Sequence, residues 1–412
     1  MLVKNVFIEQ SAEKQDIRIK DGKFSEIGAN LSPEQGEEVV DTGGKLAMPP
    51  FIDIHMHLDT TQTAGEPRWN MSGHLFEGIE IWSERKKTLT KKDVKERATK
   101  TLRMQVSNGI QYVRSHVDVT DPSLVALEAL LELKEELKEY AELQLVAFPQ
   151  EGILSFPDGK KIMENAVKAG ADAVGAIPHY EFNREYAVES LHFAVKLAEK
   201  YGKIMDVHCD EIDDPASRGL EVLATLALET GMKDKITASH TCAMQSYDNA
   251  YVFKLFRLLR MSDINFVANP FVNDIIGGLC DAYPKRRGFT RVKDLVENGN
   301  NVAFGHDVIF DPWYLFGKGN MLDVVHMGLH AAQTMGYTDI SNSYNYVTHN
   351  AAKAFNLDDK KYGIKAGNDA NLIIFDAKDF FEALNERAVV LYNWRFGKLI
   401  SKATPATKES FF

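Results

Sequence analysis

The chain has 412 residues, 44% of them hydrophobic and 26% charged, and its formal net charge is −11 at pH 7. This composition is typical of a folded globular protein. The length suits one closed α/β barrel with an appendage, or two or three compact domains. Because a negative surface does not attract a phosphate backbone or an anionic membrane, we expect neither as a partner.

Two further features bear on location. The first residues are interrupted by charges too often for a signal peptide, and nowhere do about 18 apolar residues run together. The three cysteines, Cys209, Cys242 and Cys280, are odd in number and scattered, as expected of reduced thiols. We therefore predict a cytoplasmic protein.

Residues 1–48 alternate short apolar runs with turn signals, which predicts a group of β-strands. The same alternation of short apolar runs and turn signals occurs near the other end, in GIKAGNDANLIIFDA and RAVVLYNWRFGKLI. We predict that residues 1–48 and 363–412 pair into one small β-sandwich domain, and that residues 49–362 form a separate catalytic unit.

Within residues 49–362, short buried-strand candidates alternate with amphipathic helical stretches such as 121–143 and 184–203. The strand candidates are FIDIHMH, YVRSHVDV, LQLVAFPQ, AVGAIPH, IMDVHCDE, ITASH, INFVANP and NVAFGHD. Eight strands separated by helices predict a (β/α)8 TIM-like barrel, an α/β fold whose active site lies at the carboxyl ends of the strands. The alternative is an open doubly wound sheet, in which the common position of polar residues at the ends of these strands would be a coincidence.

Four residues at these strand ends are candidate metal ligands. His55 and His57 lie two apart on one strand and therefore share a face. His208 and Asp307 end two other candidates. Three imidazole nitrogens and one carboxylate oxygen, with room for a water, are typical of a catalytic metal site. The HxH pair alone is a weak signal, because most such pairs are core or surface histidines.

Two more residues are candidates for proton transfer. Glu211 follows His208 by three positions and is the candidate proton shuttle, although a solvated glutamate is the alternative. His240 ends ITASH and can orient a metal-bound water together with Asp307, unless it is a buried histidine bonded to backbone. Three further histidines end strand candidates and could line the mouth of the barrel: His116, His179 and His306.

In this order, these residues resemble the amidohydrolase superfamily, and longer stretches resemble bacterial cytosine deaminases over nearly the whole chain. The stretches are PPFIDIHMHLDTTQTAGEPRWN, LFEGIEIWSERK, AFPQEGILS, VGAIPHYEF, DVHCDEIDD, TASHTCAM, INFVANPFVN, YPKRRG and FGHDVIFDPWY. The resemblance implies one divalent ion, Zn²⁺ or Fe²⁺, held by His55, His57, His208 and Asp307. The fourth strand candidate ends AIPHYEF and has no lysine, which members with two metals commonly use as a bridge.

The resemblance further implies hydrolytic deamination of a free cytosine-type base with release of ammonia. The metal would lower the pKa of its water, and the resulting hydroxide would attack C4 while Glu211 passes a proton to N3. His240 and Asp307 would stabilise and deprotonate the new hydroxyl. Gln150 would bind the ring carbonyl and a ring N–H. The pocket walls would be Leu75, Phe148 and Trp313, each of which could equally be a core residue.

One position departs from the family. Cytosine deaminases have HDD where this chain has His306, Asp307 and Val308. In the family the second aspartate lies near the C4 and C5 edge of the ring, where a hydrated carboxylate disfavours an apolar substituent. A C5 methyl could instead be buried against Val308, which is worth about 1 kcal/mol. We therefore predict that 5-methylcytosine is converted to thymine, unless Val308 packs outward and cytosine remains the substrate.

Two alternatives stay open. The same chemistry could act on isoguanine, isocytosine or creatinine, since only pocket residues decide the ring. A non-catalytic amidohydrolase-like scaffold is expected to lose metal ligands or the proton shuttle, whereas this chain keeps all of them. By the same resemblance we expect a homo-oligomer.

Overall fold

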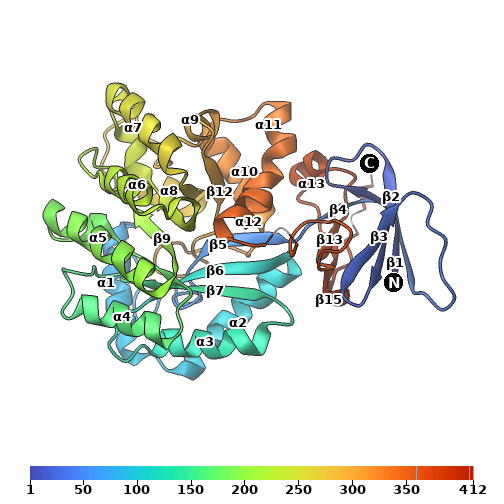
Figure 1. Cartoon of the computed structure of the whole chain (residues 1–412), viewed down its shortest axis with the longest axis horizontal. Helices are drawn as coiled ribbons and strands as arrows, with labels where there is room; N and C mark the ends of the chain where they lie inside the picture. The colour runs from blue at the N-terminus through green and yellow to red at the C-terminus, as the bar shows by residue number, and fades with distance from the viewer. Residues whose placement is uncertain (359, 408, 412) are drawn as a thin grey trace.

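The computed structural model describes residues 1–358, 360–407 and 409–411. Two separate sheets organise the chain (Figure 1). The larger one forms a barrel surrounded by helices, and the smaller one lies to one side of it and contains strands from both ends of the chain. Among the described residues, no helix is both long and apolar enough to cross a membrane.

The barrel has eight strands, each hydrogen-bonded in parallel to its neighbours in chain order. They are β5 (Phe51–Met56), β6 (Ile110–Asp118), β7 (Glu142–Phe148), β8 (Ala173–Val174), β9 (Ile204–Cys209), β10 (Ile236–His240), β11 (Asn265–Ala268) and β12 (Asn301–Phe304). The segment after β12 bonds back to β5, where the His57 N–H donates to the Asp307 carbonyl at 2.9 Å and the Asp307 N–H donates to the His55 carbonyl at 2.8 Å. Every strand candidate of the sequence overlaps one of these strands, so the predicted TIM-like barrel is confirmed.

Helices connect the strands. The α-helices are α1 (Leu75–Arg85), α2 (Lys91–Ser107), α3 (Val125–Leu137), α4 (Gly159–Ala169), α5 (Arg184–Tyr201), α6 (Gly219–Thr230), α7 (Asn249–Ser262), α8 (Pro270–Ile276), α9 (Val292–Glu297), α10 (Met321–Ala332), α11 (Tyr337–Asn342), α12 (His349–Phe355) and α13 (Phe380–Glu386). Short 3-10 turns are η1 (Lys86–Thr88), η2 (Pro178–Tyr180), η3 (Lys233–Lys235), η4 (Cys242–Ser246) and η5 (Ser343–Val347).

Helix α5 illustrates how local sequence sets these bounds. The Asn183 side chain accepts a hydrogen bond from the backbone N–H of Tyr186, which caps the helix at its start. Buried apolar residues recur at Leu191, Ala194, Val195 and Ala198, the spacing of one helical face. Beyond the last turn, the C-cap residue is a glycine in the left-handed region, with φ of 63°.

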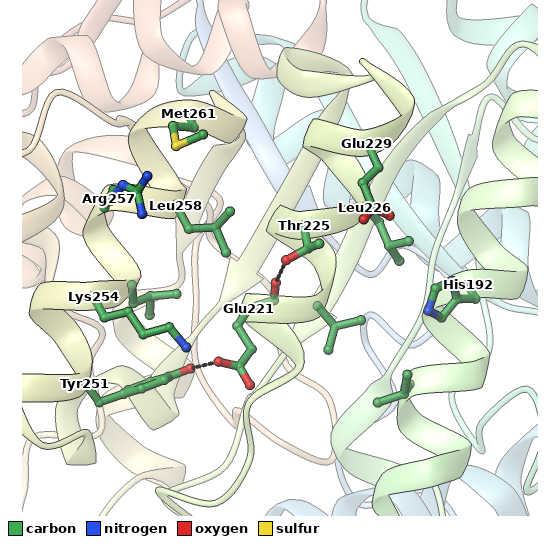
Figure 2. A pocket seen from close by; sticks show the side chains of 13 residues that line it. His192, Glu221, Thr225, Leu226, Glu229, Tyr251, Lys254, Arg257, Leu258 and Met261 are labelled. Carbon is green, nitrogen blue, oxygen red and sulfur yellow. Dashed lines mark hydrogen bonds between the residues drawn. The ribbon is translucent and has the colours of Figure 1, made fainter.

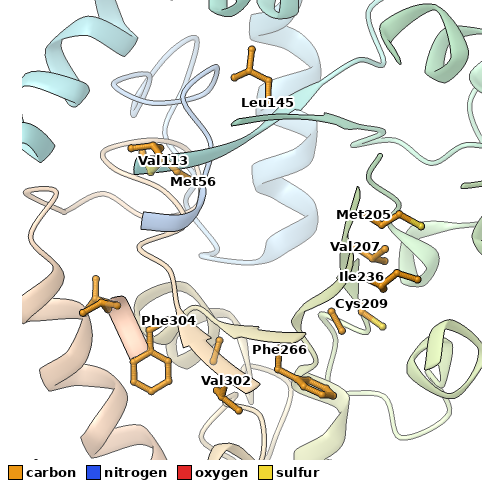
Figure 3. Close-up of a cluster of buried hydrophobic side chains, with 14 of the residues drawn as sticks. Met56, Val113, Leu145, Met205, Val207, Cys209, Ile236, Phe266, Val302 and Phe304 are labelled. Carbon is orange, nitrogen blue, oxygen red and sulfur yellow. The ribbon is translucent and has the colours of Figure 1, made fainter. Parts of the chain in front are cut away.

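The main apolar core joins the barrel strands to the helices around them. Figure 3 shows part of it, with Val113, Leu145 and Met205 on three strands and Phe266 and Phe304 on two others. All five side chains are at most 1% exposed. This packing fixes the strands, and therefore fixes the positions of the polar residues at their carboxyl ends.

The smaller unit is one continuous seven-stranded sheet in the order β15-β14-β13-β4-β1-β2-β3. Its strands are β1 (Leu2–Ile8), β2 (Lys14–Lys20), β3 (Lys23–Gly28), β4 (Val39–Met48), β13 (Leu372–Phe375), β14 (Val390–Arg395) and β15 (Lys398–Lys402). Phe24 and Trp394, from opposite ends of this order, belong to one apolar cluster, so the sheet curls around a core of its own. The pairing of the two chain ends is confirmed, and the boundaries at residues 48 and 362 stay a prediction.

Candidate active site

Five buried histidines crowd the carboxyl end of the barrel. They come from four strands and the residue after one of them: His55, His57, His116, His208 and His240. Together with two carboxylates they form three overlapping groups whose ligand atoms lie within 4.8 Å of one another. These are His55, His208 and His240; His55, His57 and His116; and Glu211, His240 and Asp307. The barrel mouth therefore has the composition of a metal site.

The four predicted ligands lie together at this end of the barrel. The Nε2 atoms of His57 and His208 are 3.1 Å apart. The Asp307 Oδ1 atom is 3.5 Å from the Nε2 atom of His55 and 3.5 Å from that of His57. Three nitrogens and one oxygen therefore converge on a common point.

The three predicted histidine ligands are neutral, as metal binding requires. Burial lowers the pKa of His55, His57 and His208 well below its usual value, so their imidazoles are neutral and their lone pairs are free to bind metal. Burial, with the nearby Glu211 carboxylate, raises the pKa of Asp307. The His55 Nε2 and Asp307 Oδ2 atoms are buried and have no hydrogen-bond partner among the described residues. A bound cation would satisfy both atoms, so the donor set fits one.

A chain of polar contacts orients His55. Its Nδ1 atom is 2.9 Å from the Ser239 hydroxyl, which donates a 2.6 Å hydrogen bond to Asp206. Arg114, fully buried, donates to the other oxygen of the same carboxylate at 2.7 Å. Such partners fix the ring orientation of a ligand histidine and leave its Nε2 atom directed at the site.

Glu211 lies directly beside the predicted metal ligands and is 5% exposed. Its Oε1 atom is 3.1 Å from Nδ1 of His240, and its Oε2 atom is 4.0 Å from Nε2 of His179. Burial raises the pKa of Glu211 to about 8. A carboxyl group with this pKa can hold a proton near neutral pH and release it, as a proton shuttle requires.

His240 is held from a second side by two asparagines. The Asn273 Nδ2 atom is 2.9 Å from the His240 Nδ1 atom, and the Asn269 amide lies 3.3 Å from both ring nitrogens. Both asparagines are fully buried. The imidazole therefore has a fixed position between Glu211 and these amides.

A narrow cavity opens above this cluster. It is lined by His57, Leu75, Gln150, His208, Glu211, Val272, Asp307, Val308 and Trp313. One part of the lining is polar, with Gln150 and Glu211, and another is apolar. On the apolar part, Val308 packs in a cluster with Val272 and Tyr314, and it is 3% exposed.

The matching family model spans residues 38–400 and is described as an amidohydrolase family. The chain belongs to this amidohydrolase family. The chain is similar to a solved 5-methylcytosine deaminase from Klebsiella pneumoniae liganded with 5-fluorocytosine. The identity is 48%, the TM-score is 0.97, and the match covers 100% of this chain and 99% of that one.

More distant relatives span almost the same length. An N-isopropylammelide isopropyl amidohydrolase from Pseudomonas sp. strain ADP is 26% identical over 408 residues, covering 98% of this chain and 97% of the relative. A pterin deaminase from Rhizobium rhizogenes is also 26% identical over 408 residues, covering 96% and 90%. The amidohydrolase architecture therefore extends over nearly the whole chain.

In this amidohydrolase, Trp313 closes one side of the cavity. Its indole N–H donates to the Leu75 carbonyl at 3.1 Å, which ties the loop after β12 to the start of α1. Gly78 makes this contact possible, because a Cβ atom there would lie 2.4 Å from the indole nitrogen. The fully buried Asp311 carboxylate accepts the backbone N–H groups of Trp313 and Tyr314 and holds the loop in place.

Phe148 lies outside the lining. Its ring stacks on the His208 imidazole, with centroids 4.0 Å apart and an interplanar angle of 21°, and it is fully buried. It therefore packs in the core against a predicted ligand, which is the alternative to the pocket wall that the resemblance implied. Of the other mouth candidates, His179 approaches Glu211, while His306 bonds through Nδ1 to the Val308 carbonyl at 3.0 Å.

Val272, Asn269 and Asn273 were not predicted from the sequence. All three lie in or next to α8, inside the quoted stretch INFVANPFVN, so the resemblance marked the segment without giving these residues roles. Ser239 and Asp206 were also missed. Ser239 lies one residue before His240, and Asp206 lies two residues before His208. Both are within strands, and only the fold shows that their side chains meet.

A larger groove of about 620 Å³ lies elsewhere, on the outer face between α5, α6 and α7 (Figure 2). Figure 2 shows Tyr251 donating to Glu221 there, with Lys254 and Arg257 nearby on α7. None of the predicted site residues lines this groove. The predicted catalytic residues and metal ligands lie instead at the barrel mouth.

Proposed function

We propose that this amidohydrolase deaminates a free cytosine-type base and that 5-methylcytosine, converted to thymine and ammonia, is its favoured substrate. The observation that carries the proposal is the division of the cavity lining, with Glu211 and Gln150 on its polar part and Val308 in an apolar cluster. The similarity to the Klebsiella 5-methylcytosine deaminase, over the full length of both chains, supports it.

The metal would be held by His55, His57, His208 and Asp307. When bound, a divalent ion, Zn²⁺ or Fe²⁺, would polarise a water and make it nucleophilic near neutral pH. Histidine and carboxylate ligands accept either ion. The contact of His55 with Ser239 keeps the proton-bearing side of the ring away from the ion.

Glu211 moves the protons. In its ionised form, whose basicity the raised pKa increases, it takes a proton from the attacking water and places it on N3 of the ring, which prepares C4 for attack. A second transfer to the exocyclic nitrogen allows the amine to leave. His240, fixed by Asn269 and Asn273, stabilises the oxygen that forms its bond to C4.

The remaining lining residues orient the base. The Gln150 amide can donate to the ring carbonyl and accept from a ring N–H, and it is 5% exposed, so bulk water competes little. Trp313 and Leu75 enclose the flat heterocycle. Val308 and Val272 contact the C5 edge of the base, where removing a methyl group from water is energetically favourable.

The test is ammonia release by metal-loaded protein from a panel of cytosine, 5-methylcytosine, isocytosine, isoguanine and creatinine. We expect the highest kcat/KM for 5-methylcytosine, with thymine as the product, and a metal count near one per chain by mass spectrometry of the native protein. Preference for another ring, or turnover of none by metal-loaded protein, would overturn the proposal. The homo-oligomer and the cytoplasmic location remain predictions.

A further inference from the structure

A second cavity of about 390 Å³ opens beside the base cavity, and we refer to it as the side vestibule. Leu75 and Glu211 line both spaces, so the two meet at these residues. Phe76, Ile276 and Leu279 add apolar surface to the vestibule. The vestibule is much larger than a path for water or ammonia needs to be.

Helix α8 shows where the two spaces join. Val272 and Ile276 are four residues apart and therefore lie on one face of the helix. Val272 lines the base cavity, whereas Ile276 lines the side vestibule. The two spaces therefore adjoin each other along α8 as well as at Leu75 and Glu211.

The orientation of the base, taken from the proposed function, directs one atom toward this junction. With N3 at Glu211 and C5 at Val308 and Val272, the atoms between them along the ring edge are C4 and its exocyclic nitrogen. The C4 atom faces the metal ligands. The exocyclic nitrogen therefore points toward the side vestibule.

We propose that the side vestibule receives the leaving amine together with a small alkyl group on it, so that the protein also hydrolyses N4-methylcytosine to uracil and methylamine. The water oxygen forms a bond to C4, and the C4–N4 bond breaks with its electron pair leaving on nitrogen. One water proton ends on N3 and the other on the amine, both carried by Glu211. No oxidant or other co-reactant is needed.

The lining of the vestibule suits this product. Leu75, Phe76 and Ile276 give a methyl group apolar surface beside the reacting nitrogen. The lining also includes Asp213, the exposed Asp214 and Arg286, whose guanidinium is paired with Asp281. Because that pair balances the arginine charge, the two remaining carboxylates favour departure of the amine as a cation.

The inference rests on the proposed function, and one experiment separates them. Holoenzyme is given cytosine, 5-methylcytosine and N4-methylcytosine, with uracil or thymine measured by chromatography and methylamine by mass spectrometry. We expect uracil and methylamine in equal amounts from N4-methylcytosine, at a kcat/KM within about 100-fold of that for cytosine. Failure on all three bases would refute the proposed function. Turnover of the first two without methylamine would refute only this inference.

A blocking variant tests the route. Ile276→Trp fills the vestibule, and we expect it to lower kcat/KM for N4-methylcytosine at least about 10-fold more than for cytosine. The matched control is Ile275→Trp, because the neighbouring side chain is 42% exposed and does not line either cavity. The control is expected to leave the ratio unchanged. Equal losses for both substrates in Ile276→Trp would show that the vestibule serves entry of the base, and would overturn the inference.

Discussion

Replacement of Val308 by aspartate tests the assignment of the apolar wall to the C5 edge. Val308 is 3% exposed and packs with Val272 and Tyr314, so the new carboxylate would replace apolar surface in a nearly closed cavity. It would also lie next to Asp307 in the chain. We expect kcat/KM to fall much more for 5-methylcytosine than for cytosine, because only 5-methylcytosine places a methyl group against the hydrated carboxylate.

The size of the effect follows from two contributions. Loss of the apolar contact costs the methyl group about 0.8 kcal/mol. Imperfect hydration of the carboxylate in the presence of that methyl adds about 1–3 kcal/mol. The total of about 2–4 kcal/mol predicts that the ratio of kcat/KM for 5-methylcytosine to that for cytosine falls roughly 30- to 1000-fold.

The assay measures both kcat/KM values in the natural protein, Val308→Asp and Val308→Ala, with metal content and Tm recorded for each. The alanine variant removes apolar surface without adding charge, and its ratio should fall only about 4- to 10-fold. If a folded, metal-loaded Val308→Asp protein kept its ratio within about threefold of the natural one, Val308 would not contact C5.

Three other predictions address separate parts of the site. His208→Ala or Asp307→Ala should lower bound metal and turnover by orders of magnitude, and full metal content in either variant would contradict the ligand assignment. Glu211→Gln should keep the metal but lose most of its turnover, since the amide cannot shuttle a proton; normal rates would assign the shuttle elsewhere. Gly78→Ala must displace the Trp313 indole, so KM should rise by about tenfold, with a smaller change in kcat; unchanged kinetics would show that the indole does not close the cavity.

The barrel could be predicted because its strands are buried runs that end in polar residues. The buried strand β9 and His208 at its carboxyl end illustrate the pattern. Strand β8 has only two residues, Ala173 and Val174, and its place in the barrel was predictable because the segment AVGAIPH around it is a short apolar run that ends in a polar residue. The hydrogen-bond order of the smaller sheet was not predictable, since an alternation of apolar and polar residues predicts strands but not which strands pair with each other.

The candidate site was predictable in part. Residues whose own side chains are predicted to bind metal or transfer protons, such as Glu211 and the predicted ligand histidines, can be recognised from their residue type and position in the sequence. Residues that act through another group do not. Phe148 could be a wall or a support, and only the fold shows its ring against His208. Ser239 and Asp206 meet through the pairing of β9 with β10, which no local pattern reveals.

The position of β4 has a consequence for biosynthesis. This strand pairs with β1 on one side and with β13 on the other, although roughly 320 residues separate β4 from β13 in the chain. A ribosome therefore releases an unprotected strand edge first and supplies its cover only after those roughly 320 further residues. During that interval the whole barrel is synthesised. Because β4 leads directly into β5, the nascent barrel begins on a strand whose sheet is still half built.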